Sequence, residues 1–189
     1  MTVITLANGL PFDFSGETIA NVTPEVVALS LSQQCRYAGH TPYFYSVAEH
    51  SVHVSDHVDR AYRFAALMHD AHEAVVQDIV RPLKTDHFRE FEAMVQRLFE
   101  RHFGFEVGVE VMRADDRMLA SEGREFFGDD VTATWGLSER PFRRPFFRLR
   151  PDTPEKARRM WLAVYAEHAP DHAPTHIPHL YPEDPLSWR

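Results

Sequence analysis

Two histidines and two aspartates at separate places in the chain could together hold a metal ion. They are His50, the adjacent pair His69 and Asp70, and either Asp115 or Asp116. Imidazoles and carboxylates suit a first-row divalent ion, and we expect Co, Mn, Zn, Ni or Fe, with Mg as a further alternative. Four protein ligands leave an ion that prefers six with room for water and a phosphoryl oxygen. This set therefore predicts a hydrolytic centre.

Further acids and cations follow the histidine-aspartate pair. Glu73 lies four residues after His69, on the same face of a helix, where it could act as a general base. Asp78 comes next, and Arg81 and Lys84 could hold phosphate oxygens or neutralise charge that develops in a transition state. Cations beside a carboxylate-metal centre favour hydrolysis of a phosphate ester over hydrolysis of a peptide.

Helical periodicity places the predicted ligands on different helices. Thr23-Pro24 and Thr153-Pro154 are typical helix starts, and Gly104 is a typical helix end. The pattern predicts an all-α bundle of about six helices, at residues 23–35, 45–57, 62–76, 86–103, 109–127 and 153–168.

The two ends of the chain differ from this helical pattern. Residues 3–14 alternate between apolar and polar around Asn8-Gly9, which predicts a short β-hairpin. Five prolines follow Ala169 and predict an extended segment. We expect a single domain over 1–168, with the hairpin and its lead-in over 1–22, a loop over 134–150, and a Pro/His-rich tail over 169–189 that is disordered or packs on a neighbouring subunit.

Composition narrows the class of protein. A chain of 189 residues has room for one domain with a core, and its net charge of −8 argues against binding to a nucleic-acid polymer. Cys35 is the single cysteine, so a disulfide framework or a thiolate metal cluster is excluded. The absence of a long apolar run or a signal sequence predicts no membrane span and a cytoplasmic protein.

The run His69-Asp70-Ala71-His72-Glu73, followed by Asp78 and by Arg81-Pro82-Leu83-Lys84, resembles the central motif of the HD-domain phosphohydrolase superfamily. A narrower resemblance is to the branch of bacterial 5′-deoxynucleotidases and phage dATP triphosphohydrolases. The segments that carry it are Cys35-Arg36-Tyr37, Gly39-His40, Tyr45 to Ser51, and Ala114-Asp115 through Glu122.

The resemblance implies a role for each matching residue. It implies the metal ligands His50, His69, Asp70 and Asp115, the last favoured over Asp116 because it follows Ala114. It also implies that Glu73 and Asp78 position or activate the attacking water, that Arg36 and Lys84 bind the substrate phosphate, and that Tyr37 contacts the nucleoside. The implied fold is an HD-domain helical bundle, and the implied assembly is a homo-oligomer, a dimer or larger.

Several functions stay open at this point. The substrate is expected to be a deoxynucleoside monophosphate, with a deoxynucleoside triphosphate cleaved to release triphosphate as the alternative. A catalytically silent nucleotide-binding regulatory module is a further alternative. A second metal at His53, His57 or His72 is less favoured than ordinary hydrogen-bonded histidines.

Overall fold

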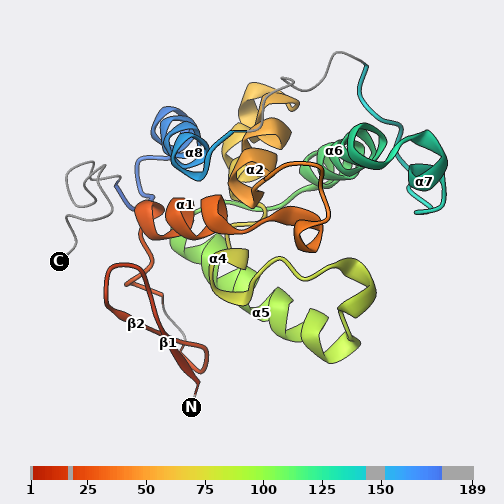
Figure 1. The fold of residues 1–189 in the computed structure, drawn as a ribbon. Coiled ribbons are helices and arrows are strands. Elements are labelled where there is room, and N and C mark those ends of the chain that lie inside the picture. Colours follow the sequence, from red (N-terminus) through yellow and green to blue (C-terminus); the bar gives the residue numbers. More distant parts are fainter. Residues whose placement is uncertain (1, 17–18, 144–151, 176–189) are drawn as a thin grey trace.

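A computed structural model describes residues 2–16, 19–143 and 152–175, and it is mostly helical (Figure 1). This confirms the all-α class with a short N-terminal hairpin. The α-helices are α1 (Pro24–Gln33), α2 (Val47–Asp56), α3 (Arg63–Met68), α4 (Glu73–Val76), α5 (Asp86–Phe103), α6 (Val109–Phe127), α7 (Asp129–Ala133) and α8 (Pro154–His168). Short 3₁₀ segments lie at Arg36–Gly39, Arg60–Tyr62 and Arg81–Leu83.

Capping residues fix where the helices begin. Thr23, Ser46, Thr85 and Thr153 each accept a hydrogen bond through the side-chain oxygen from a backbone N–H in the first turn of α1, α2, α5 and α8. Gly104 ends α5 in the left-handed conformation, with φ of 72°. The predicted starts at Thr23-Pro24 and Thr153-Pro154 and the predicted end at Gly104 are confirmed.

The helix expected over 62–76 is divided in two. Residues 69–72 form a turn between α3 and α4, in which Ala71 N–H bonds to Met68 O at 2.9 Å and Glu73 N–H bonds to Asp70 O at 3.0 Å. These bonds span three residues instead of four, so the backbone is wound more tightly here than in an α-helix. The tight turn contains the histidine-aspartate pair, and its geometry decides where these two side chains point.

Two apolar clusters position α6 relative to the rest of the bundle. In the larger cluster, side chains of the hairpin, α1, α2, α3, α5 and α8 pack together. In the smaller one, Val54 of α2 and Ala66 of α3 pack against Val111, Ala114 and Met118 of α6. Because Ala114 is buried in this contact, the residue that follows it is held at a fixed place next to α2 and α3.

Trp161 is the largest side chain buried in the core and offers a test of this packing. It lies on α8, which packs on α1, α2 and α3, and its ring stacks on Tyr165 at 5.5 Å. We expect Trp161→Ala to lower the free energy of unfolding by about 3–5 kcal/mol, measured by urea denaturation. Arg159→Ala, at an exposed position of the same helix, should change it by less than about 0.5 kcal/mol. Equal midpoints for the two variants would contradict the assignment of α8 to the core.

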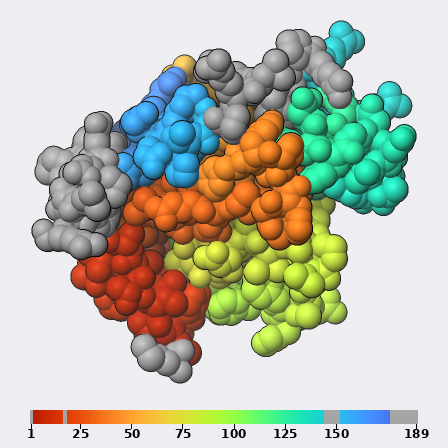
Figure 2. Space-filling model, in the orientation of Figure 1, coloured from red at the N-terminus to blue at the C-terminus, as the bar shows by residue number. Residues whose placement is uncertain are grey.

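The predicted hairpin is formed by β1 (Val3–Thr5) and β2 (Pro11–Asp13), which pair antiparallel. In the space-filling view, the hairpin and the α6–α7 region lie at opposite ends of the visible face (Figure 2). The structure describes the expected loop over 134–150 as far as residue 143 and the expected tail over 169–189 as far as residue 175. The other residues of both segments lie outside the described part of the chain. None of the described helices combines the length and apolar composition needed to cross a bilayer.

Candidate metal centre and pocket

The four predicted ligands meet at one point between α2, α6 and the turn after α3. His50 Nε2 lies 3.1 Å from Asp115 Oδ1 and 3.6 Å from Asp70 Oδ2. His69 Nε2 lies 3.1 Å from Asp70 Oδ2 and 3.7 Å from Asp115 Oδ1. Asp116 Oδ1 lies 3.2 Å from Arg81, which also lies 3.9 Å from Asp115 Oδ2. The geometry therefore selects Asp115 from the two adjacent aspartates.

The Nε2 atoms of the two histidines face this point, where loss of a proton leaves a lone pair for a metal. His50 donates through Nδ1 to Glu122 Oε1 at 2.5 Å, and His69 donates through Nδ1 to the carbonyl of Ala66 at 2.7 Å. When Nδ1 carries the proton in this way, Nε2 of a neutral imidazole is left as a metal donor. Within the described residues both Nε2 atoms are buried and make no hydrogen bond. Two buried lone pairs facing two carboxylates fit a divalent cation.

Charges in the centre shift the pKa values of its members in opposite directions. Burial lowers the pKa of His69, but the nearby carboxylates of Asp70 and Asp115 outweigh it and raise this pKa well above its usual value. Burial raises the pKa of Asp70, but His69 and His50 outweigh it and lower this pKa. The carboxylates are therefore ionised, and a metal that enters the centre displaces protons from the histidines.

Glu122 is a buried carboxylate behind the metal centre. Its Oε1 accepts hydrogen bonds from His50 and from Tyr45 OH at 2.9 Å, and its Oε2 accepts from Tyr37 OH at 2.6 Å and from Arg36 Nε at 3.3 Å. Burial raises its pKa, but Arg36 and His50 overcome this effect and lower the pKa to about 2. Sequence reasoning gave Glu122 no role in the site, although it lies seven residues after Asp115 on one helix face.

We expect Glu122→Gln to weaken divalent metal binding by about 10- to 100-fold, because hydrogen-bond partners of ligating histidines tune ligand basicity and orientation. Titration of the apoprotein with Co²⁺, followed by calorimetry, measures the change. Glu110→Gln, at an exposed position of the same helix, is the matched control and should bind Co²⁺ as the wild type does. Unchanged affinity in Glu122→Gln would remove Glu122 from the centre.

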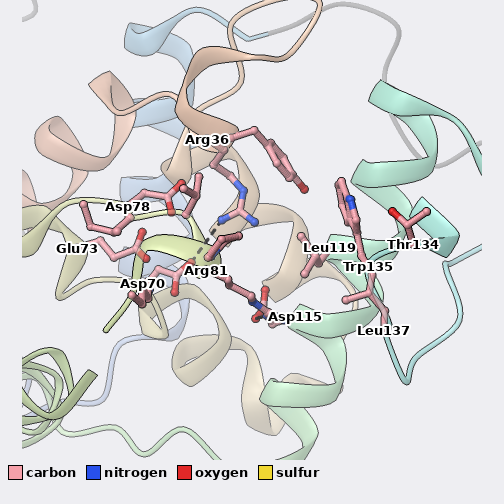
Figure 3. A pocket seen from close by; sticks show the side chains of 15 residues that line it. Arg36, Asp70, Glu73, Asp78, Arg81, Asp115, Leu119, Thr134, Trp135 and Leu137 are labelled. Atoms are coloured by element: carbon pink, nitrogen blue, oxygen red, sulfur yellow. Dashed lines mark ion pairs between the residues drawn. The ribbon is translucent and has the colours of Figure 1, made fainter. Parts of the chain in front are cut away.

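A cavity of about 570 Å³ opens beside the metal centre, and its two sides differ in character (Figure 3). Asp70, Glu73 and Asp78 lie on one side, and on the other a wall from α6 and the segment after α7 carries Leu119, Trp135 and Leu137 (Figure 3). One end is therefore suited to a charged group near the metal centre and the other to a flat apolar group. The charged residues that line the cavity are Arg36, Asp70, Glu73, Asp78, Arg81, Lys84 and Asp115.

The two candidate catalytic acids both line this cavity. Glu73 is buried, and burial together with the charges of Asp70 and Asp78 raises its pKa well above its usual value. Burial also raises the pKa of Asp78, and the guanidinium of Arg36 opposes the effect. A positive ion at the ligand atoms would favour the ionised form of Glu73, which is the form that accepts a proton.

The two predicted phosphate-binding cations already have carboxylate partners. Arg36 lies 3.2 Å from Glu122 and 3.7 Å from Asp70, and Lys84 Nζ lies 2.7 Å from Glu92 Oε1. Arg81, which the sequence suggested could also hold phosphate oxygens, is more accessible, with its side chain 58% exposed. A phosphate in this cavity would share these cations with the carboxylates.

Tyr37, the residue expected to contact the nucleoside, lines the cavity and donates its hydroxyl to Glu122. Its ring stacks on Trp135 with 6.0 Å between centroids. Sequence reasoning missed Trp135 because this residue lies in the segment taken as a loop excursion, where no periodicity marks its position. Trp135 is the larger aromatic surface of the apolar wall.

A second group of possible ligands lies near His72. His72 Nε2 is 3.8 Å from Glu92 Oε1, and Glu73 is adjacent. The ammonium group of Lys84 already neutralises Glu92 at short range, so this group has much less need of a metal than the first.

Comparisons with known proteins identify relatives of the chain. No family model matches it. The chain is 34% identical over 166 residues to the uncharacterized protein YfdR of Escherichia coli strain K12, an alignment that covers 86% of this chain and 93% of YfdR. It is 36% identical over 88 residues to the uncharacterized protein RCAP_rcc00048 of Rhodobacter capsulatus, covering 42% of this chain and 45% of that protein. At this identity and coverage, the chain belongs to the same protein family as YfdR.

Proposed function

We propose that this protein is an HD-domain, metal-dependent phosphohydrolase that acts on deoxynucleoside monophosphates in the cytoplasm. The observation that carries the proposal is the meeting of two buried imidazole Nε2 atoms with Asp70 and Asp115 at the edge of a cavity. The cavity adds a charged end and an aromatic wall, which suit a phosphate and a nucleobase.

His50, His69, Asp70 and Asp115 would hold the divalent ion. When bound, such an ion supplies Lewis-acid activation of the phosphoryl group and of water. The ligand histidines are held in one tautomer by Glu122 and by the Ala66 carbonyl, so they need no rearrangement to bind.

The other residues would bind the substrate and move protons. Arg36 and Lys84 would hold phosphate oxygens, and Glu73 would accept a proton from the attacking water while Asp78 orients that water. The water oxygen forms a bond to phosphorus, the bond from phosphorus to the 5′ oxygen breaks, and a proton returns to the 5′ oxygen. The products are a nucleoside and inorganic phosphate.

A product screen tests this proposal. The protein is loaded separately with Mn, Co, Ni, Zn or Mg and incubated with deoxynucleoside mono-, di- and triphosphates. We expect inorganic phosphate from the monophosphates. Inorganic triphosphate from a triphosphate would instead establish the alternative reaction, and tight binding without turnover under any metal would establish a silent regulatory module.

A further inference from the structure

Gln34 joins the backbones of the two candidate catalytic acids. It caps the C-terminus of α1, and its Oε1 accepts a hydrogen bond from the N–H of Asp78 at 3.1 Å. Its Nε2 donates to the carbonyl of Glu73 at 3.0 Å and to Ser30 Oγ at 3.1 Å. These partners fix the orientation of the Gln34 amide, because the N–H of Asp78 must face Oε1 and the carbonyl of Glu73 must face Nε2.

The segment held in this way is short and strained. The helix α4 has only four residues, and the carbonyl of Glu73 accepts from the N–H of Gln77 at 2.9 Å as well as from Gln34. Gln77, between the two acids, has φ of 74° and ψ of 155°, a backbone conformation that is almost confined to glycine. Such a conformation persists where several surrounding contacts hold it. Gln34 makes hydrogen bonds to Glu73 and Asp78, on both sides of Gln77.

The strained turn decides where Asp78 lies. Gln77 follows α4 directly with a positive φ, and Asp78 then lines the same cavity as Glu73 (Figure 3). A relaxed conformation at Gln77 would send the following residue in another direction. The Gln34 amide therefore fixes the separation between the two backbones from which these carboxyl groups extend.

We propose that Gln34 is a positioning residue, which holds Glu73 and Asp78 in the arrangement needed for proton transfer. This inference rests on the proposed function. A purely structural role would be to join α1 to α4, as Ser30 does when it donates to the carbonyl of Ala74 at 2.9 Å. The two roles differ in what a substitution changes.

The test uses Gln34→Leu, which keeps a similar volume and removes both hydrogen bonds to the acids. We expect kcat to fall on the order of 10²-fold, because small misplacements of catalytic groups have effects of that size. KM and the affinity for Co²⁺ should stay within about twofold of the wild type, since no predicted ligand or phosphate-binding residue is touched. Hydrogen exchange at the Asp78 amide should become faster, which is a readout independent of activity.

One control separates positioning from structure. Gln33→Leu makes the same substitution at an exposed neighbour and should keep kcat near the wild-type value. Turnover is expressed per bound metal, below the melting temperature of each variant.

Three results would overturn the inference. The first is a Gln34→Leu variant as active as Gln33→Leu, and the second is a loss of kcat that only follows a loss of bound metal. The third is a wild type that hydrolyses no nucleotide, which would reject the proposed function as well and is thereby distinguished from the other two.

Discussion

Asp70→Ala is expected to remove the divalent ion and to abolish nucleotide hydrolysis while leaving helix content nearly intact. Asp70 Oδ2 lies within 3.1–3.7 Å of His69, His50 and Arg36, so it lies next to both proposed histidine ligands and the arginine proposed to bind phosphate. Its side chain is at the edge of the cavity and contributes little to the apolar core. Metal content after dialysis, measured by elemental analysis, and circular dichroism check the two parts of this result.

The adjacent aspartates on α6 provide a matched pair of controls for the ligand set. Asp115→Ala should lose the metal as Asp70→Ala does, whereas Asp116→Ala should keep it, because Asp116 pairs with Arg81 outside the centre. A full complement of metal in Asp70→Ala, or metal loss in Asp116→Ala with retention in Asp115→Ala, would refute the ligand assignment.

Glu73→Gln is expected to keep the metal and to lose turnover. The substitution preserves the size of the side chain and removes the oxygen that would accept a proton from water. General base catalysis contributes roughly 10²- to 10⁴-fold to a rate, and we expect a fall in kcat of that order with the metal affinity little changed. Steady-state kinetics on the best substrate of the product screen, together with metal analysis, measure both quantities.

Glu90→Gln is the control for this second prediction, because Glu90 is an exposed glutamate on α5. It should behave as the wild type does in both assays. Turnover in Glu73→Gln equal to that of the control would exclude Glu73 from proton transfer and leave Asp78 as the remaining candidate catalytic acid.

Helix boundaries were predictable from sequence where a local signal stood at the boundary. The predicted helices over 86–103 and 109–127 match α5 and α6 to the residue, since Thr85, Gly104 and Gly128 mark their limits. The break after Met68 carries no such signal. It contains no glycine or proline, and the tight turn there follows from tertiary contacts, including the bonds from α1 to Glu73 and Ala74.

The candidate site was predictable to a similar extent. The resemblance implied that His50, His69, Asp70 and Asp115 converge, and the structure brings these residues together. Glu122 and Trp135 were not assigned because their roles depend on which side chains they meet across the fold. Periodicity gives the face of a helix, but it does not give the partner on another element.

Three parts of the candidate site lie on the single helix α6. They are the proposed ligand Asp115, the cavity-wall residue Leu119 and Glu122, which accepts a hydrogen bond from His50. Each residue inserted into a helix rotates everything beyond it by about 100°. An insertion or deletion between Asp115 and Glu122 would therefore turn the Glu122 side chain away from His50. We infer that the seven-residue interval within α6 has a fixed length.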